Sequence, residues 1–274
     1  MAKKRRQKKK QSRTGWLISP QQVQAWLSQA ESQIMAQDYA GALKTARRVL
    51  RYVHRGSEPY ADAYHYMGLA FLMLQDFAAA YDALSTVLGL RPESTDTWYN
   101  RGLCCRYVAR TGQSVRDLEQ AIALEKNPIL VEKYEKELAF SRGLVQHALD
   151  LRGPGFSLDQ LIEQQETYQR ALKAMEAKQW AEGGALFRQV IDMGDCLPQP
   201  WGNLAVAYIM RQRYDEAEAA LRRALEIDPH YELARRNLEA LPGIRQAGPP
   251  DLEIHSPFEG RDIKRSLTFI RDDE

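Results

Sequence analysis

Apolar residues recur along the chain at the spacing of one face of an α-helix. The clearest stretch begins at Ala61 and has a predicted turn at residues 74–76. Before the turn the recurring residues are Tyr64, Gly68 and Phe71, and after it they are Phe77, Ala80, Leu84, Val87 and Leu88. Because a helix brings residues three and four apart onto one face, this pattern predicts two amphipathic helices joined by a short turn. Pro92 closes the unit, since proline has no amide donor and clashes with the preceding helical turn.

The same framework returns in steps of 34 residues. It is nearly complete in 61–94 and in 198–231, where it reads Trp201, Ala205, Tyr208, Tyr214, Ala217, Leu221, Ala224, Leu225 and Pro229. Less regular copies are predicted at 23–56, 95–128 and 164–197. A period of this length indicates an array of helix pairs, because one pair cannot bury its apolar face without a neighbour.

The order of a Trp, a small residue, an aromatic, an Ala, a second aromatic and a Pro resembles the tetratricopeptide-repeat (TPR) family. Several positions depart from the family pattern: Gln33 replaces an aromatic, Gly183 replaces Ala, and His54 replaces Pro. The copy at 95–128 also has Thr111 and Ser114 in its turn region, and its Pro comes late, at Pro128. The resemblance implies an all-α protein, an α-solenoid of helix-turn-helix repeats. It also implies that the first helix of each repeat lines a concave surface that binds a peptide of a partner protein.

Residues 129–163 do not follow the repeat. Leu130, Tyr134, Leu138 and Val145 have helical spacing, which predicts a helical spacer, and Ser157 with Gln160 reads as a capping box. We therefore expect two groups of repeats within six consecutive segments of the chain. These are a basic tail (1–18), repeats one to three (19–128), the spacer (129–163), repeats four and five (164–231), a capping helix (232–241) and a flexible C-terminal tail (242–274).

The resemblance also predicts which residues would line the peptide groove. On the first helices and the capping helix, the residues at the groove-lining positions are His65, Tyr66, Leu69, Tyr99, Asn100, Leu103, Arg106, Tyr107, Asn203, Val206 and Asn237. An Asn side chain both donates and accepts, so it can hold a peptide backbone, and Tyr offers a broad amphipathic contact. The alternative is that these residues bond and pack within the fold.

One TPR subtype grips a C-terminal carboxylate with Lys, Asn, Asn, Lys and Arg at fixed places. The matching places here hold Leu27, Glu31, Tyr66, Asp96 and Asn100. None of the three cationic places is basic, so the sequence argues against this kind of clamp.

Charge is distributed unevenly along the chain. The net charge is +2, yet residues 1–13 carry eight Lys or Arg residues and no acid, so the rest is mildly acidic. The dense block is Lys3, Lys4, Arg5, Arg6, Lys8, Lys9 and Lys10. Such a block can bind RNA, DNA, a ribosome or another polyanion, or serve as a nuclear-import signal in a nucleated cell. The alternative is a solvated tail.

The segment around Leu267, Phe269 and Ile270 is either a short binding segment or a frayed end.

Composition points away from catalysis and secretion. Cys104, Cys105 and Cys196 are too few for a disulfide framework, and no apolar run is long enough to cross a bilayer. The five His residues form no metal-binding motif and no phosphate loop occurs, so we expect no cofactor, no metal and no enzymatic activity. The sequence thus predicts a cytoplasmic scaffold for a protein or peptide partner. The alternative is a nucleic-acid- or ribosome-associated adaptor tethered by its basic tail, and a homo-oligomer is a third hypothesis.

Overall fold

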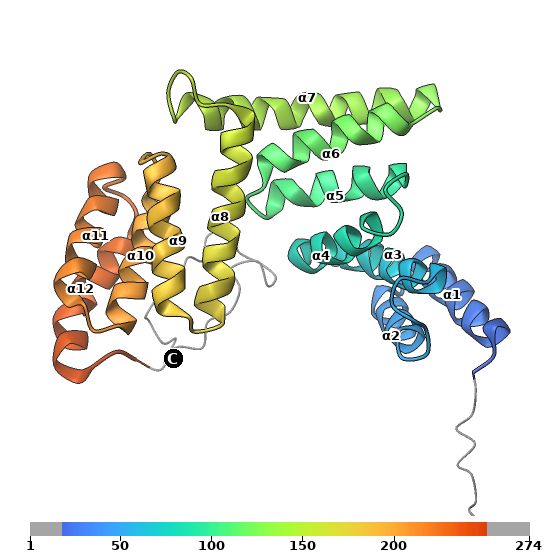
Figure 1. The fold of residues 1–274 in the computed structure, drawn as a ribbon, viewed down its shortest axis with the longest axis horizontal. Helices are drawn as coiled ribbons and strands as arrows, with labels where there is room; N and C mark the ends of the chain where they lie inside the picture. The colour runs from blue at the N-terminus through green and yellow to red at the C-terminus, as the bar shows by residue number, and fades with distance from the viewer. Residues whose placement is uncertain (1–17, 251–274) are drawn as a thin grey trace, which may run out of the picture.

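The computed structural model describes residues 18–250, and these form helices and connecting turns without a β-strand. In chain order the helices are α1 (Pro20–Met35), α2 (Tyr39–Val49), α3 (Glu58–Met73), α4 (Phe77–Leu88), α5 (Thr95–Tyr107), α6 (Thr111–Leu124), α7 (Pro128–Asp150), α8 (Leu158–Glu176), α9 (Trp180–Met193), α10 (Pro198–Met210), α11 (Tyr214–Ile227) and α12 (Glu232–Ala247). Each helix packs on the next, which makes an all-α solenoid (Figure 1).

Five helix pairs share one turn. In α1–α2, α3–α4, α5–α6, α8–α9 and α10–α11 the middle turn residue has a positive φ between 53° and 61°. These residues are Gln37, Gln75, Ala109, Lys178 and Gln212. In every pair the next amide donates to a carbonyl five residues back, at 2.8–2.9 Å. This closure satisfies carbonyls that a helix end leaves free. The recurrence of the same turn shows that the five pairs are copies of one unit.

Local chemistry fixes several helix starts. The Asp38 and Asp76 carboxylates accept from backbone amides in the first turns of α2 and α4, at 2.9 and 3.1 Å. The predicted capping box is confirmed: Ser157 and Gln160 bond reciprocally at the start of α8. Such caps stabilise a helix by about 1 kcal/mol each because they satisfy orphan amides.

Small residues allow the two helices of a pair to approach closely. A Cβ added at Gly68 would lie 2.6 Å from Leu84 Cδ2, and one at Gly102 would lie 3.0 Å from Leu118 Cγ. At the irregular position Gly183 a Cβ would lie 2.8 Å from Met175 Sδ. The departure from Ala at Gly183 therefore has a packing reason: the methionine fills the space.

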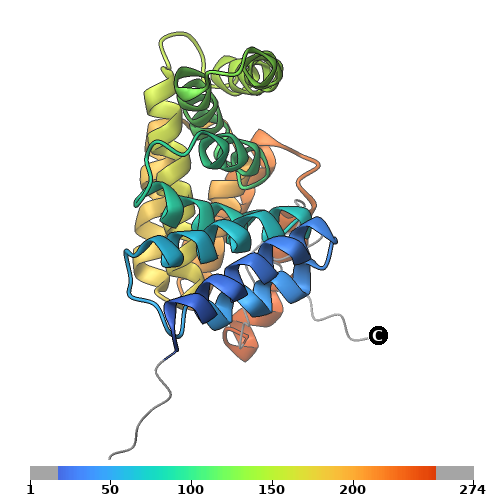
Figure 2. The same ribbon diagram turned by 90° about the vertical axis from the view of Figure 1, so that its right-hand side faces the viewer.

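The long helix α7 interrupts the pairing. It packs on α6 as the first helix of a further repeat would, but the chain then turns away at residues 151–157 into α8 (Figures 1 and 2). In Figure 2 α7 is seen almost end-on at the top, above the first group. The α7 helix therefore has no second helix of its own, and α8 begins the second group of pairs.

The C-terminal helix is longer than the sequence indicated. The expected capping helix ended at Leu241 before Pro242, whereas α12 continues through Pro242 to Ala247. Pro242 can lie inside the helix because it removes only one backbone hydrogen bond, while the apolar residues before and after it still pack on the core. Leu241 is buried and Ile244 packs on the same core as Leu238, so burial holds the last turns in place.

Within residues 18–250 no helix is both long and apolar enough to cross a membrane. The basic block Lys3–Lys10 and the C-terminal segment around Phe269 lie outside the described residues.

Candidate functional site

The first helices of the pairs form the inner row of the first group. The α1 helix packs on α3, α3 on α5, and α5 on α7, whereas their second helices α2, α4 and α6 do not pack closely on one another. A stack that is tighter on one side curves toward that side. The faces of α3 and α5 that look away from α4 and α6 therefore line the concave wall.

On α3 the predicted residues His65, Tyr66 and Leu69 are all half-buried. The His65 ring lies 5.7 Å from that of Tyr66 in an edge arrangement, and its Nε2 is 3.6 Å from Oδ2 of Asp96 on α5. Burial raises the pKa of the Tyr66 phenol, with the carboxylates of Glu31 and Asp62 adding to the shift. The Tyr66 hydroxyl is thus neutral at physiological pH and can donate a hydrogen bond.

On α5 the residues divide between those open to solvent and those that pack under α7. Asn100 is half-buried, and its side chain bonds to none of the residues in 18–250. Tyr107 is 43% exposed and stacks on Phe77 at 4.0 Å between ring centroids. Both side chains are available to a ligand.

The other three predicted residues of α5 face α7. Tyr99 is buried and stacks on Tyr134 at 4.3 Å, and Leu103 packs into the same cluster. The Arg106 guanidinium donates to Glu137 Oε2 at 2.6 Å and to Ser141 Oγ at 2.8 Å. The role of these side chains is to join the third pair to α7.

The predicted residues of the second group are internal. Asn203 is 2% exposed and donates through Nδ2 to the hydroxyl of Tyr168 on α8 at 3.0 Å. Val206 and Asn237 are equally buried, and Asn237 Oδ1 has no hydrogen-bond partner among residues 18–250. Of the predicted residues, His65, Tyr66, Leu69 and Asn100 thus remain accessible on α3 and α5, and Tyr107 is exposed beside α4.

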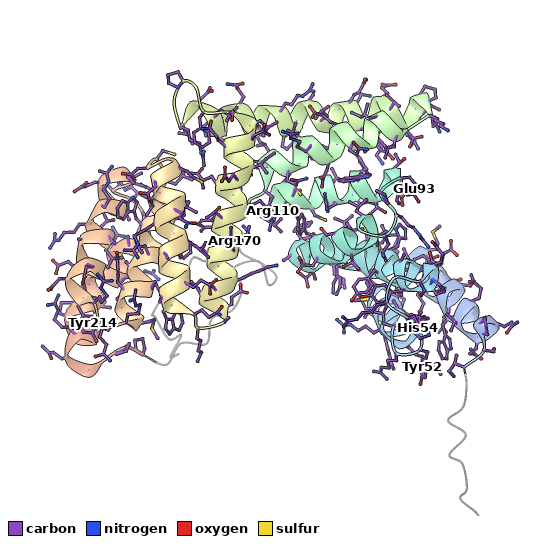
Figure 3. The ribbon with its side chains drawn as sticks, in the orientation of Figure 1. Tyr52, His54, Glu93, Arg110, Arg170 and Tyr214 are labelled. Atoms are coloured by element: carbon purple, nitrogen blue, oxygen red, sulfur yellow. The ribbon has the colours of Figure 1, made fainter. Side chains whose placement is uncertain are left out.

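Sequence reasoning missed a second feature, the polar junction between α8 and the first group. Gln165 accepts from the Gly112 amide at 3.0 Å and donates to Thr111 at 2.8 Å, and Gln169 donates to the carbonyl of Val108 at 2.9 Å. Arg110, in the α5–α6 turn, pairs with Glu166. Figure 3 labels Arg110 and Arg170 on the two sides of this junction, at the centre of the molecule. Gln165 and Gln169 belong to no recognisable sequence motif, so the sequence alone could not show that they bond to the first group.

A cleft opens beside this junction. It has a volume of about 270 Å³ and lies between α4 and α8, with Tyr81, Asp82, Arg110 and Lys173 in its wall. Asp82 and Lys173 face each other across it at 3.8 Å. Its charges are thus mixed and partly neutralise one another.

The described residues offer no arrangement that suggests a metal site, since no three His, Cys, Asp or Glu side chains in 18–250 gather closely enough. The three cysteines are free thiols, as expected. Burial raises the pKa of Cys104 to about 12 and that of Cys105 well above its usual value. These two thiols are therefore protonated and poor nucleophiles at neutral pH.

The fold and the inner wall define the class of this protein as an α-helical repeat solenoid. Comparison with family models then identifies the repeat, because residues 198–231 match the tetratricopeptide repeat. The chain thus contains a tetratricopeptide repeat, and the matched unit is the pair α10–α11 with the turn that follows it. It thus has the architecture of a protein–protein interaction scaffold.

Comparison with curated protein sequences finds no match. Among solved structures, the chain is similar to the TPR domain of P58(IPK), with a TM-score of 0.44 and 15% identity over 82% of this chain and 65% of that one. It is also similar to YrrB, described as a TPR protein with an unusual peptide-binding site, with a TM-score of 0.36 and 15% identity over 78% and 90% of the two chains. Yeast Tom70 matches with a TM-score of 0.35 and 11% identity over 87% and 53%.

Proposed function

We propose that this protein is a scaffold that holds a peptide segment of a partner protein against the inner faces of α3 and α5. The observation that supports the proposal is the half-buried side chain of Asn100 on α5, which bonds to none of the residues in 18–250. An amide with both a donor and an acceptor free can bind the backbone of an extended peptide in either register.

The neighbouring residues supply the rest of a peptide contact. Tyr66 offers a hydroxyl and a half-buried ring, Leu69 an apolar surface, and Tyr107 an exposed ring already fixed by Phe77. Aromatic rings held in place lose little entropy on binding, which is why they dominate interaction energies. Asp96, beside His65, adds a carboxylate that favours a basic residue in the peptide.

The buried residues of the predicted set have a supporting role in this proposal. Tyr99, Leu103 and Arg106 fix α7 against α5, whereas Asn203, Val206 and Asn237 are buried within the second group. A substitution at any of them would change the wall by repacking the helices. They are therefore unsuitable for testing direct contact.

The test begins with peptides of about 12 residues selected from a random library on the full chain. Their affinities are then measured for a Tyr66→Ala/Asn100→Ala variant and for a control, Tyr214→Ala/Asn127→Ala. Tyr214 lies on α11 and Asn127 caps the start of α7, so neither control residue belongs to α3 or α5. Far-ultraviolet circular dichroism checks that each variant is folded.

We expect the groove variant to lose at least tenfold in affinity, since removing one aromatic anchor and one backbone clamp costs about 2 kcal/mol or more. The control should retain the wild-type affinity. Selected peptides that bind both variants equally, or a library from which no peptide is enriched, would refute the groove proposal.

Four finer expectations accompany this one. The basic residues Lys3–Lys10 give the chain a sequence-independent attraction to polyanions, which is the alternative of a nucleic-acid- or ribosome-associated adaptor. Cytoplasmic localisation, the absence of enzymatic activity and self-association through repeat faces are also proposals. Light scattering at high micromolar concentration decides the last of them: a monomer would refute it.

A further inference from the structure

The second helix, α2, and the turn after it carry cations without any acid. From residue 39 to residue 57 the chain has Lys44, Arg47, Arg48, Arg51 and Arg55, together with His54, and neither Asp nor Glu. Residues 58–250 have the opposite balance, with 21 Lys or Arg against 27 Asp or Glu. The first helix pair is thus a positive region on an otherwise mildly acidic body.

These cations are exposed and not neutralised by neighbours. All five are exposed to solvent, and none forms an ion pair with another residue in 18–250. Elsewhere the arginines are mostly paired, as Arg101 is with Asp117 and Arg223 with Asp195. A cluster of like charges without counter-charges raises the local potential and favours an anionic ligand.

Three of these cations line a hollow of about 500 Å³ between α1 and α2. Its wall includes Gln29, Lys44, Arg48, Arg51 and Tyr52. Figure 3 labels Tyr52 and His54 at the lower end of the first group, well away from Arg110 and the junction. Lys44 and Arg48 are four residues apart on α2, so the helix repeat places them on one face, and Arg51 follows in the turn after the helix.

The aromatic side of the hollow is fixed in place. The guanidinium of Arg48 lies 4.0 Å from the centroid of the Trp26 ring, and the Tyr52 ring lies 5.5 Å from it. Trp26 is buried, whereas Tyr52 is 53% exposed. The buried indole therefore holds a planar cation and an exposed ring side by side at the edge of the group of charges.

We propose that this surface, the α2 basic face (Lys44, Arg47, Arg48, Arg51, Tyr52 and Arg55), binds single-stranded nucleic acid. The cations would contact successive phosphates, while a base stacks on Tyr52 or on the guanidinium plane of Arg48. A positive groove with interleaved aromatic rings is the arrangement that recognises a single strand without reading its sequence. The Gln29 amide can bond to a base edge or a sugar.

Charge alone would equally attract an acidic peptide, but such a peptide has no base that could stack on the exposed ring of Tyr52. A rigid duplex would use the cations and leave its bases inaccessible to Tyr52. The surface is separate from the wall of α3 and α5, so the peptide-groove proposal and this one can fail independently. The basic block Lys3–Lys10 carries charge of the same sign, so the experiment must control for it.

The test must separate the face from the basic block, and it uses the full chain throughout. In a background variant the seven cations from Lys3 to Lys10 are replaced by Gln, which preserves the length. Three variants are then made in it: Arg48→Gln/Arg51→Gln, Tyr52→Ala, and the control Arg188→Gln/Arg211→Gln. Arg188 and Arg211 are also exposed and form no ion pair with residues in 18–250, so the control removes the same charge elsewhere.

Binding is followed by fluorescence anisotropy with a labelled 12-nucleotide oligo-uridine, a duplex of the same length and a 12-residue poly-glutamate peptide, across a salt titration. We expect oligo-uridine to bind the background variant and the control alike. Arg48→Gln/Arg51→Gln should bind at least tenfold more weakly, with a salt slope smaller by about 1.4, since each neutralised phosphate on a single strand contributes about 0.7. Tyr52→Ala should lose about tenfold through the lost stacking, with its salt slope unchanged.

Three results would overturn the proposal. The first is an equal loss in the control and the charge variant, because binding would then follow net charge alone. The second is an unchanged affinity in Tyr52→Ala together with tight binding of poly-glutamate, which would assign the face to an acidic protein partner. The third is tighter binding of the duplex than of oligo-uridine.

Discussion

The ion pair between Arg101 on α5 and Asp117 on α6 gives the sharpest test of what holds a repeat together. The Asp117 side chain is 0% exposed and accepts from Arg101 Nε at 2.7 Å and Nη2 at 2.8 Å. Its Oδ1 also accepts from Gln113 at 2.6 Å. Burial alone would lower the pKa of Arg101, but the hydrogen bonds and charge of Asp117 outweigh it, and the pKa is raised. The Arg101 guanidinium is therefore charged in the folded chain.

Replacing Asp117 by Ala leaves a cation in a nearly closed site. Breaking a buried ion pair from one side costs about 3–5 kcal/mol, because the remaining charge keeps its desolvation penalty without its partner. Arg101 retains Ser85 Oγ at 3.2 Å and the ring of Trp98 at 4.9 Å, and its side chain is 11% exposed. We therefore expect Asp117→Ala to lower the free energy of unfolding by about 3 kcal/mol, at the low end of that range.

The assay is urea unfolding, followed by circular dichroism and by tryptophan fluorescence so that agreement of the two transitions checks two-state behaviour. Arg101→Met/Asp117→Leu serves as the matched variant. Because it removes both charges and keeps the apolar volume, it should be more stable than Asp117→Ala alone. A loss of under 1 kcal/mol in Asp117→Ala, or a double variant that is no more stable than Asp117→Ala, would refute the reasoning.

Three further outcomes follow from the described residues. Gly68→Ala should destabilise the chain by about 1–3 kcal/mol in the same urea assay, because the added methyl group displaces Leu84; no change in midpoint would contradict the close approach. Ala109→Gly should stabilise it by about 1 kcal/mol, since φ is +53° there and glycine adopts that conformation without a Cβ clash; a lower midpoint would show that the turn is unstrained. Native protein at pH 8 should react with a thiol reagent at Cys196 alone, because Cys104 and Cys105 are buried. The free energy of unfolding should also fall as the pH rises from about 9 toward 12. Folding raises the pKa of Cys104 to about 12, so in this window only the unfolded chain releases that proton readily. Rapid labelling at Cys104, or a stability independent of pH in that window, would contradict its burial.

Much of the fold is determined locally and could be predicted from the sequence. The period of 34 residues placed five helix pairs, because each pair repeats the same apolar face, the same small residues and a turn at the same position. Pro92 and Pro229 end helices through their missing donor, and Ser157 with Gln160 caps one; both effects act within a few residues. These are properties that a short window of sequence carries by itself.

The candidate site could be predicted only in part. Residue type and register placed Tyr66, Asn100 and Tyr107 on the first helices, and the structure leaves them accessible. The same register could not show that Tyr99 would stack on Tyr134, or that Asn203 would bond to Tyr168. Those pairings join residues more than 30 positions apart, so they depend on which helix packs beside which.

Tertiary structure alone decided the junction between the two groups. Nothing in the glutamines of α8 distinguishes a solvent-exposed face from one that bonds to the Gly112 amide and the Val108 carbonyl. The continuation of α12 through Pro242 is likewise a result of packing, since burial of Leu241 offsets one lost hydrogen bond. The sequence by itself determined the repeating unit, because helix periodicity, caps and turns are short-range. The position of α7, the docking of α8 and the accessible residues on the wall were decided by long-range packing, whose free energy exists only once distant helices meet.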